Sequence, residues 1–218
     1  DRVQSSIERN GIGFLFAPAF HPAMKNVAPA RKTIGIRTVF NIAGPLSNPC
    51  TNVTGQVIGV FEPSLMEKLA EVCPGYVGEA MIVHAADGFD ELSNTCENDI
   101  VWVTGSSNGV VQTKRLRLNP KVVGMQLARP EQLVVTTKED SVKSTLAAIY
   151  GTGSQEKEDI VVLNASAALV VGKVAIDLKE GVEIARTAIK NESAKEKLAH
   201  LVASCGDLEK LRKAEKAL

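Results

Sequence analysis

Several features that would signal common classes of binding partner are missing from this sequence. Its 25 Lys and Arg residues are balanced by 25 Asp and Glu residues, so no excess positive charge is present to attract nucleic acid or an anionic membrane. No run of 18 or more apolar residues could cross a lipid bilayer, and no signal-peptide pattern opens the chain. These absences predict a cytoplasmic protein without nucleic-acid or membrane partners.

Cysteine and histidine are also scarce. The four cysteines are widely spaced and form no Cys-x-x-Cys pair, and the three histidines are scattered along the chain. A zinc site therefore has no local support in the sequence, because such sites bring His and Cys ligands together at short spacings. Reduced thiols in a cytoplasmic protein are the simpler interpretation.

What the sequence does contain is a short apolar run followed at once by a concentration of carboxylates. Ala80 to Val83 predicts a strand buried on both faces of a parallel sheet, and Asp87, Asp90 and Glu91 follow it. Ligands of open α/β sheets lie beyond the carboxyl ends of the strands. Two adjacent carboxylates with no His or Cys nearby suit Mg²⁺. A solvated acidic turn is the alternative that this stretch leaves open.

The pattern on either side predicts an α/β fold. Gly55 to Phe61 predicts a second strand, and a βαβ unit with parallel strands follows from the helix between the two. That helix begins near Pro63 and has a predicted core face of Leu65, Leu69 and Val72. Ile100 to Thr104 and Val110 to Leu118, joined through an Asn-Gly turn, predict an antiparallel hairpin. We expect a mostly parallel central sheet with this hairpin at its edge, flanked by helices.

Helices are expected at both ends of the chain. Asp1 to Asn10 predicts a helix that Gly11 ends, and Phe14 to Phe16 predicts a short buried strand. From Glu139 onward the pattern is helical, with segments at Ser141 to Tyr150, Lys157 to Ala175, Leu178 to Asn191, Ser193 to Ser204, and Leu208 to the end. The predicted inward face of the second of these is Val161, Ala165, Ala168, Leu169 and Gly172.

A few local signals have both a structural and a functional interpretation. Gly151 to Ser154 is rich in glycine, but it follows a helix rather than a strand, so a helix stop and a cap explain it more simply than a phosphate site. His84 is explained more simply as a hydrogen-bonded core histidine than as an acid or base. Arg31 follows a break at Pro29 and is either a surface charge or a carboxylate- or phosphate-binding group. His21 is either a cap or a pocket residue.

Five blocks of sequence carry a resemblance to a known family. They are Gly11–Pro18, His21–Lys25 with Arg31, Gly35–Asn41, Gly44–Pro49 and Asp87–Glu91, and a sixth segment, Asn164–Leu169, fits a late helix. In this order and spacing they resemble anthranilate phosphoribosyltransferase over essentially the whole chain. The resemblance implies that residues 1–218 are a C-terminal α/β domain of the nucleoside phosphorylase and phosphoribosyltransferase type.

The resemblance also implies an activity and a set of site residues. The family transfers the phosphoribosyl group of phosphoribosyl pyrophosphate to the amino group of anthranilate in tryptophan biosynthesis, and the complete enzyme is expected to be a homodimer. Asp90 and Glu91 match the acids that hold Mg²⁺ against the pyrophosphate. Arg31 matches the arginine that receives the anthranilate carboxylate, and His21, Gly44 and Pro45 match residues that line the anthranilate route. No residue is assigned as an acid or base.

Two departures from the family pattern qualify these expectations. The family usually has His-Gly before the acidic loop, where this sequence has His84-Ala85. Its N-terminal helical domain and its phosphate-binding glycine segments are not found in the 218 residues, so we expect this chain to fold but not to catalyse the reaction alone. A pyrimidine nucleoside phosphorylase-like enzyme and a non-enzymatic nucleic-acid-binding relative are the alternative functions.

Overall fold

The computed structural model describes residues 2–20, 46–50, 52–105 and 110–218. The chain forms two compact units. One consists of Asp1–Thr51 with Lys197–Leu211, and the other of Asn52–Glu196 with Arg212–Leu218. The second unit contains the sheet and the acidic loop, so the candidate site belongs to it.

A four-stranded sheet in the order β1-β2-β3-β4 forms the centre of the second unit. Its strands are β1 (Gly55–Gly59), β2 (Glu79–Ala85), β3 (Asn98–Gly105) and β4 (Val111–Leu118). β1 and β2 are parallel, as the βαβ pattern predicts, and β3 and β4 form the expected antiparallel edge hairpin. β2 and β3 are also antiparallel, so one of the three pairings is parallel and the expectation of a mostly parallel sheet was wrong at this pairing. The reason is that the loop between β2 and β3 has no crossover helix, which a parallel connection normally needs.

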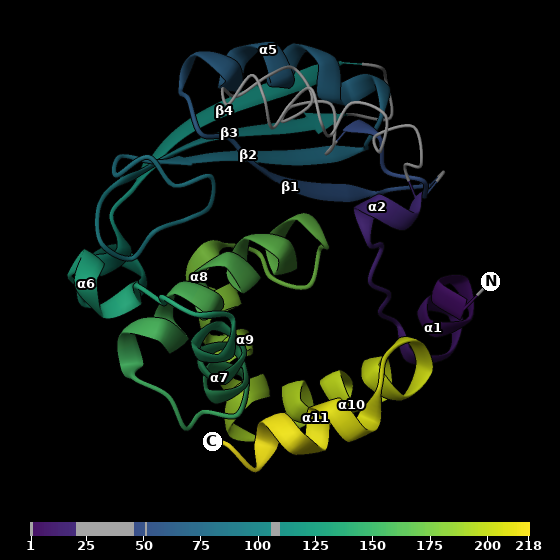
Figure 1. Ribbon diagram of the computed structural model, residues 1–218. Helices are drawn as coiled ribbons and strands as arrows, with labels where there is room; N and C mark the ends of the chain where they lie inside the picture. The colour runs from purple at the N-terminus through teal and green to yellow at the C-terminus, as the bar shows by residue number, and fades with distance from the viewer. Residues whose placement is uncertain (1, 21–45, 51, 106–109) are drawn as a thin grey trace, which may run out of the picture. The chain divides into compact units, whose positions relative to one another are not determined.

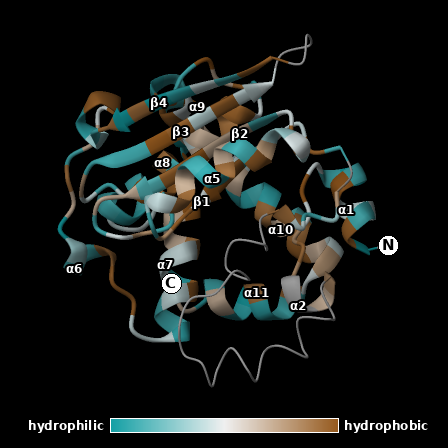
Figure 2. Ribbon diagram, turned by 90° about the horizontal axis from the view of Figure 1, so that it is seen from above, coloured by the Kyte–Doolittle hydropathy of each residue, from teal (hydrophilic) through white to brown (hydrophobic). Residues whose placement is uncertain are grey.

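Helices cover both faces of this sheet (Figure 1). Helix α5 (Ser64–Val72) packs on one face against β2 and β3, and α8 (Gln155–Val171) packs on the other against β1 and β2. In Figure 2, hydrophobic and hydrophilic residues alternate along α5 where it lies over the sheet. Because both faces are covered, all seven residues of β2 are buried. This burial agrees with the continuous apolar run in the sequence.

The other helical segments follow in chain order. They are α1 (Arg2–Asn10), α2 (Ala17–Phe20), η1 (Cys73–Gly75), η2 (Pro120–Val123), α6 (Pro130–Leu133), α7 (Lys138–Ile149), α9 (Leu178–Lys190), α10 (Ser193–Cys205) and α11 (Leu208–Glu215). The five helices predicted after Glu139 are therefore present with small shifts at their ends. In the described part of the chain, none of the helices has the length and apolar character needed to cross a membrane.

The buried faces of two helices differ from those predicted. In α5 the buried residues are Met66, Leu69 and Ala70, while Val72 is 43% exposed. In α8 the deeply buried residues are Val162, Leu163, Ser166, Ala167, Val170, Val171 and Asp159. This face is displaced by about one residue from the predicted one, and Val161 is 38% exposed. Apolar residues surround much of α8, so periodicity alone could not select the stripe that faces the sheet.

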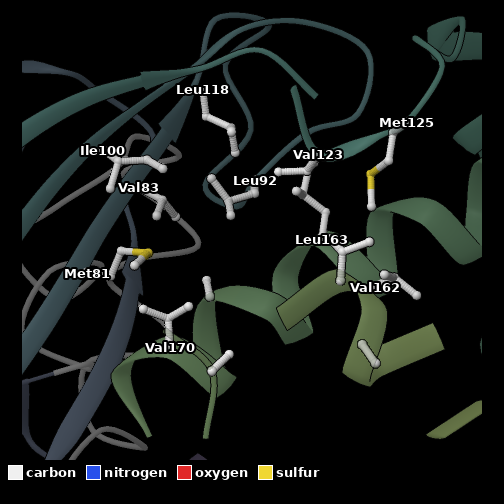
Figure 3. Packing of buried hydrophobic residues seen from close by; sticks show 14 of the residues in the cluster. Met81, Val83, Leu92, Ile100, Leu118, Val123, Met125, Val162, Leu163 and Val170 are labelled. Carbon is white, nitrogen blue, oxygen red and sulfur yellow. The ribbon is translucent and has the colours of Figure 1, made fainter. Parts of the chain in front are cut away.

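The hydrophobic core lies between the sheet and α8 with α9 (Figure 3). Alternate residues of β2 point to opposite faces, and Met81 and Val83 join the cluster on the α8 side. Leu92, which comes from the loop after β2, is fully buried in the same cluster. The acidic loop is therefore anchored in the core directly after the adjacent carboxylates Asp90 and Glu91.

The first unit is held together by contacts between α1 and the second half of α10. The Arg2 guanidinium donates to the carbonyl oxygen of Ser204 at 3.1 Å, and the Asn10 side chain donates to the Ser204 hydroxyl at 2.6 Å. The predicted strand at Phe14 to Phe16 does not form. These two phenylalanine rings stack on each other and are 65% and 56% exposed, so the segment lacks the burial expected of a core strand.

Candidate functional site

The acidic loop, residues 86–97, connects the carboxyl end of β2 to the start of β3. Its first turn is tight: the Gly88 amide donates to the Ala85 carbonyl at 2.8 Å, and the Ala85 amide donates to the Phe89 carbonyl at 3.1 Å. Gly88 has φ of 90°, a conformation that glycine adopts at little cost. The loop thus reverses direction just before Asp90 and Glu91, at the sheet edge where the sequence predicts a ligand site.

Asp87 closes this loop internally. Its carboxylate accepts hydrogen bonds from the hydroxyl of Ser93 at 2.8 Å, from the hydroxyl of Thr95, and from the amide of Phe89 at 3.3 Å. Desolvation by burial would by itself raise the pKa of Asp87, but the hydrogen bonds from Thr95, Ser93 and the Phe89 amide outweigh it and lower the pKa below its usual value. Asp87 is therefore a charged structural group of the loop.

Asp90 and Glu91 differ from Asp87 because, within the described residues, their carboxylates accept no side-chain or backbone hydrogen bond like those that hold Asp87. They also have no cationic partner there. Desolvation raises the pKa of the Glu91 carboxyl, and the negative charges of Asp90 and Asp87 raise it further. A site that concentrates negative charge in this way gains stability from a bound cation.

The donor set of this pair fits Mg²⁺ better than a metal that is bound by protein ligands alone. In the part of the chain that the structure describes, no group of three or more His, Cys, Asp or Glu side chains converges as a metal site. Mg²⁺ commonly takes one or two carboxylates and completes its shell with water and substrate phosphate. Asp90 and Glu91 would supply the two carboxylates.

Two asparagines, the half-buried Asn164 and the fully buried Asn98, hold the loop immediately after this pair. The side-chain oxygen of Asn164 on α8 accepts from the Leu92 amide at 2.9 Å, and its NH₂ group donates to the Leu92 carbonyl at 2.8 Å. Asn98 on β3 binds the next residue in the same manner, with bonds of 2.7 and 2.8 Å to the Ser93 amide and carbonyl. The backbone amide and carbonyl of Leu92 are thus bound by a side chain of α8, and those of Ser93 by a side chain of β3.

Gly59, at the end of β1, approaches the same loop from another side. A Cβ atom at this position would overlap the carbonyl oxygen of Asp90, so only glycine allows the two backbones to lie this close. His84, at the end of β2, is buried, and its Nδ1 lies 2.8 Å from the Val60 carbonyl oxygen. The prediction that His84 is a hydrogen-bonded core histidine is therefore confirmed. Its contact with Val60 links β2 to the segment that follows β1.

Glu91 also borders a hollow on the surface. This cavity, of about 250 Å³, is lined mainly by apolar side chains of the loop, α6, α7 and α8. Its polar lining includes Glu91 and Lys157, and the Lys157 ammonium donates to the Ser144 hydroxyl at 2.9 Å. Glu91 thus lies next to a concave surface.

The structure describes only part of the predicted site. Asp90 and Glu91 lie in the acidic loop as expected, whereas His21, Arg31, Gly44 and Pro45 lie outside the described residues. The contributions of Gly59 and Asn98 were not anticipated from the sequence. Asn164 stands in a segment that the family resemblance includes, but its contact with the loop could not be read from the sequence because the two are 72 residues apart.

Comparison with known proteins identifies the class. Residues 1–195 match the family model described as glycosyl transferase family, a/b domain. The match covers most of the chain, and the chain therefore belongs to this family.

Curated proteins that are similar in sequence carry the same name. The chain is 41% identical over 202 residues to an anthranilate phosphoribosyltransferase of Acetivibrio thermocellus, covering 92% of the chain and 56% of that protein. It is 43% identical over 189 residues to the one from Methanosarcina barkeri, covering 87% and 50%. The chain thus spans about half the length of the curated relatives it matches.

Solved structures with a similar fold are also anthranilate phosphoribosyltransferases. The chain matches anthranilate phosphoribosyltransferase from Thermus thermophilus with a TM-score of 0.80 and 35% identity, covering 93% of the chain and 58% of that structure. It matches the enzyme from Saccharomyces cerevisiae in complex with PRPP and Mg with a TM-score of 0.77 and 26% identity, covering 92% and 56%. The resemblance seen in the sequence and the expected α/β class are therefore confirmed.

Proposed function

We propose that the complete protein transfers the phosphoribosyl group of phosphoribosyl pyrophosphate to the amino group of anthranilate, with residues 1–218 as its C-terminal α/β domain. The observation that carries this proposal is the Asp90–Glu91 pair beyond the carboxyl end of β2, which has no ion-pair partner among the described residues, in a chain similar to anthranilate phosphoribosyltransferases. One similar structure is a complex with PRPP and Mg, and another is a complex with 4-fluoroanthranilate. We propose Mg²⁺ as the metal that the pair binds.

The proposed chemistry places modest demands on the protein. The anthranilate nitrogen forms a bond to C1 of the ribose, the bond from C1 to the pyrophosphate oxygen breaks, and the nitrogen loses a proton. An aryl amine needs little activation as a nucleophile, so the main tasks are alignment of the two reactants and stabilisation of the departing charge. Mg²⁺ would neutralise pyrophosphate charge. The role of Asp90 and Glu91 is to hold that ion beside the sheet edge.

Removal of both carboxylates tests this assignment. In the complete protein, Asp90→Asn with Glu91→Gln is expected to lower Mg²⁺-dependent turnover about 100- to 1,000-fold, a range typical for the loss of groups that stabilise transition-state charge. The free energy of unfolding is expected to change by less than about 0.5 kcal/mol, because both side chains are exposed. Turnover is measured from the loss of anthranilate fluorescence during Mg²⁺ titration.

A matched control separates the pair from general loss of charge. Glu131→Gln with Glu183→Gln removes two exposed carboxylates elsewhere in the same unit and is expected to leave turnover unchanged. If the Asp90/Glu91 variant retained wild-type turnover and an unchanged Mg²⁺ titration, the assignment would be wrong. If the wild-type protein acted on thymidine and phosphate, or bound single-stranded DNA, while ignoring anthranilate, an alternative function would replace the proposed one.

Arg31 provides a second test, directed at the substrate. We propose that its guanidinium binds the anthranilate carboxylate, a bond of a kind that contributes about 1.5–3 kcal/mol. Arg31→Ala in the complete protein is therefore expected to lower the catalytic efficiency for anthranilate about 10- to 150-fold. The KM for phosphoribosyl pyrophosphate should change much less. Equal losses for the two substrates would instead make Arg31 a phosphate-binding or structural residue.

The remaining expectations follow from this proposal. His21, Gly44 and Pro45 are proposed to line the route of anthranilate. The protein is proposed to be cytoplasmic, and a homodimer when complete. Size-exclusion chromatography with light scattering measures the oligomeric state directly.

A further inference from the structure

We propose that Asn164 is a positioning residue for the Asp90–Glu91 pair: from α8 it fixes the backbone of Leu92 and thereby the placement of the two carboxylates that precede it. This inference rests on the proposed function, in which the pair binds Mg²⁺. It concerns a residue that does not touch substrate and acts through the loop.

The contact between Asn164 and Leu92 is made at two points. One bond holds the Leu92 amide at 2.9 Å and the other holds the Leu92 carbonyl oxygen at 2.8 Å. Two bonds to one residue fix the direction of its backbone as well as its position. The Asn164 NH₂ group also donates to the Ile160 carbonyl at 2.9 Å, which holds the Asn164 side chain itself against α8. The loop is therefore joined to a rigid helix through an oriented amide.

Further contacts restrict the segment around the pair. The Leu92 side chain is fully buried in the core, and the Asp90 backbone lies against Gly59 of β1. The acidic pair thus lies between a close approach to β1 and an attachment to α8. A flexible loop would let the carboxylates turn away from one another, because Asp87, Asp90 and Glu91 carry like charges. Attachments outside the pair oppose this tendency and keep both carboxylates available to one cation.

A purely structural role for Asn164 makes a different prediction. An asparagine whose side-chain oxygen and NH₂ group are both hydrogen-bonded contributes to stability in any part of a protein. Such a role would lower the free energy of unfolding after mutation but would leave the metal affinity of the folded protein unchanged. Metal affinity and local opening of the loop, both measured on folded protein, distinguish the two roles.

The test uses two variants and one control in the complete protein. Asn164→Ala removes all three side-chain bonds. Asn164→Ser is too short to reach Leu92, but its hydroxyl can still bind the Ile160 carbonyl one turn back, so it isolates the attachment to the loop. Ser166→Ala is the control, because Ser166 lies on the same helix, is buried more deeply than Asn164, and donates only to the Leu163 carbonyl.

Three quantities are measured at a temperature at which circular dichroism shows each protein to be folded. They are the hydrogen-exchange rate of the Leu92 amide without metal, the affinity for Mn²⁺ alone by titration, and the Mg²⁺ concentration that gives half-maximal turnover. Both Asn164 variants are expected to exchange the Leu92 amide at least tenfold faster and to bind Mn²⁺ at least fivefold more weakly. Their half-maximal Mg²⁺ concentration is expected to rise by a similar factor. The Ser166 control is expected to match the wild type in all three.

The possible results separate this inference from the function it rests on. A wild-type protein that bound no Mn²⁺ and showed no Mg²⁺-dependent turnover would overturn the proposed function, and this inference with it. Metal binding in the wild type that persisted unchanged in both Asn164 variants would overturn this inference alone. If the alanine variant failed to fold, the serine variant decides the question by the same measurements. Equal weakening in the Ser166 control would show a general effect of α8 stability and would also overturn it.

Discussion

Two glycine-containing loops of the second unit look similar in sequence but are held in different ways. The acidic loop, residues 86–97, is attached to other elements through Gly59, Asn98 and Asn164. The loop at Gly151–Ser154 is closed locally: the amides of Thr152 and Gly153 donate to the Ala147 carbonyl of α7 at 2.9 and 3.1 Å.

The comparison shows why only one of these loops is a candidate site. In the Gly151–Ser154 loop the amides that could have bound a phosphate are used to end α7, as the sequence predicts for a helix stop. In the acidic loop the backbone is held by distant residues, while the carboxylates of Asp90 and Glu91 stay unpaired within the described part of the chain. Long-range anchoring of the backbone with free charged side chains is the arrangement that binding sites require.

The largest expected effect comes from adding one methyl group at the contact between β1 and the acidic loop. Gly59→Ala would place a Cβ on the Asp90 carbonyl oxygen, and we expect a loss of about 3 kcal/mol in the free energy of unfolding, at the upper end for overpacking. In the other loop, Gly153→Ala would meet Ala147 at 3.3 Å and should cost less than about 1 kcal/mol. Urea unfolding of both variants measures the difference. Similar losses would mean that the close approach at Gly59 is not a special constraint.

A second pair of variants compares the two loops at glycines that both have positive φ. Gly88 and Gly151 have φ of 90° and 65°, so alanine at either position is expected to cost about 1–2 kcal/mol. A Cβ at Gly151 would also meet the Ile189 side chain at 3.0 Å, whereas Gly88 has open space around it. Only Gly88→Ala is expected to raise the Mg²⁺ concentration needed for half-maximal turnover, because only Gly88 belongs to the turn that precedes Asp90. Thermal unfolding and Mg²⁺ titration of turnover test the two parts separately. An effect of Gly151→Ala on the Mg²⁺ titration would contradict the division between the loops.

The smallest expected effect is a dependence of stability on pH. The pKa of Glu91 is raised above 4.5 in the folded protein. The ionised carboxylate is therefore less stable in the folded state than in the unfolded state, and its charge lowers the free energy of unfolding. Below pH 4.5 the folded and unfolded states are both mostly protonated and no penalty exists. The penalty develops as pH rises from 4.5 to the raised pKa of the folded state, and it is fully present above that pKa.

Glu91→Gln should therefore raise the stability of the metal-free protein at neutral pH. A change of about 0.5 kcal/mol corresponds to about 1–2 °C in Tm for a protein of this length. The difference from the wild type is expected to disappear below pH 4.5. Thermal unfolding of both proteins in EDTA, from below pH 4.5 to neutral pH, measures the difference in Tm. A variant that is less stable than the wild type at neutral pH would contradict the idea that Glu91 is held in an unfavourable electrostatic environment.

The secondary structure was largely predictable, and the errors have identifiable causes. The apolar run at Ala80 to Val83 predicted β2 because burial on both faces leaves a continuous hydrophobic signal. The strand expected at Phe14 to Phe16 did not form, because three apolar residues do not by themselves provide a partner strand. The buried face of α8 was misplaced because apolar residues lie on several of its sides.

The sequence by itself determined the α/β class, the family resemblance and the presence of two adjacent carboxylates after a buried strand. These follow from local composition and short spacings, which a linear sequence records directly. The tertiary structure alone decided that Gly59 contacts Asp90 and that Asn164 binds Leu92. Each of these joins residues that are separated along the chain and meet only after the sheet and α8 have packed, so no local pattern could specify them.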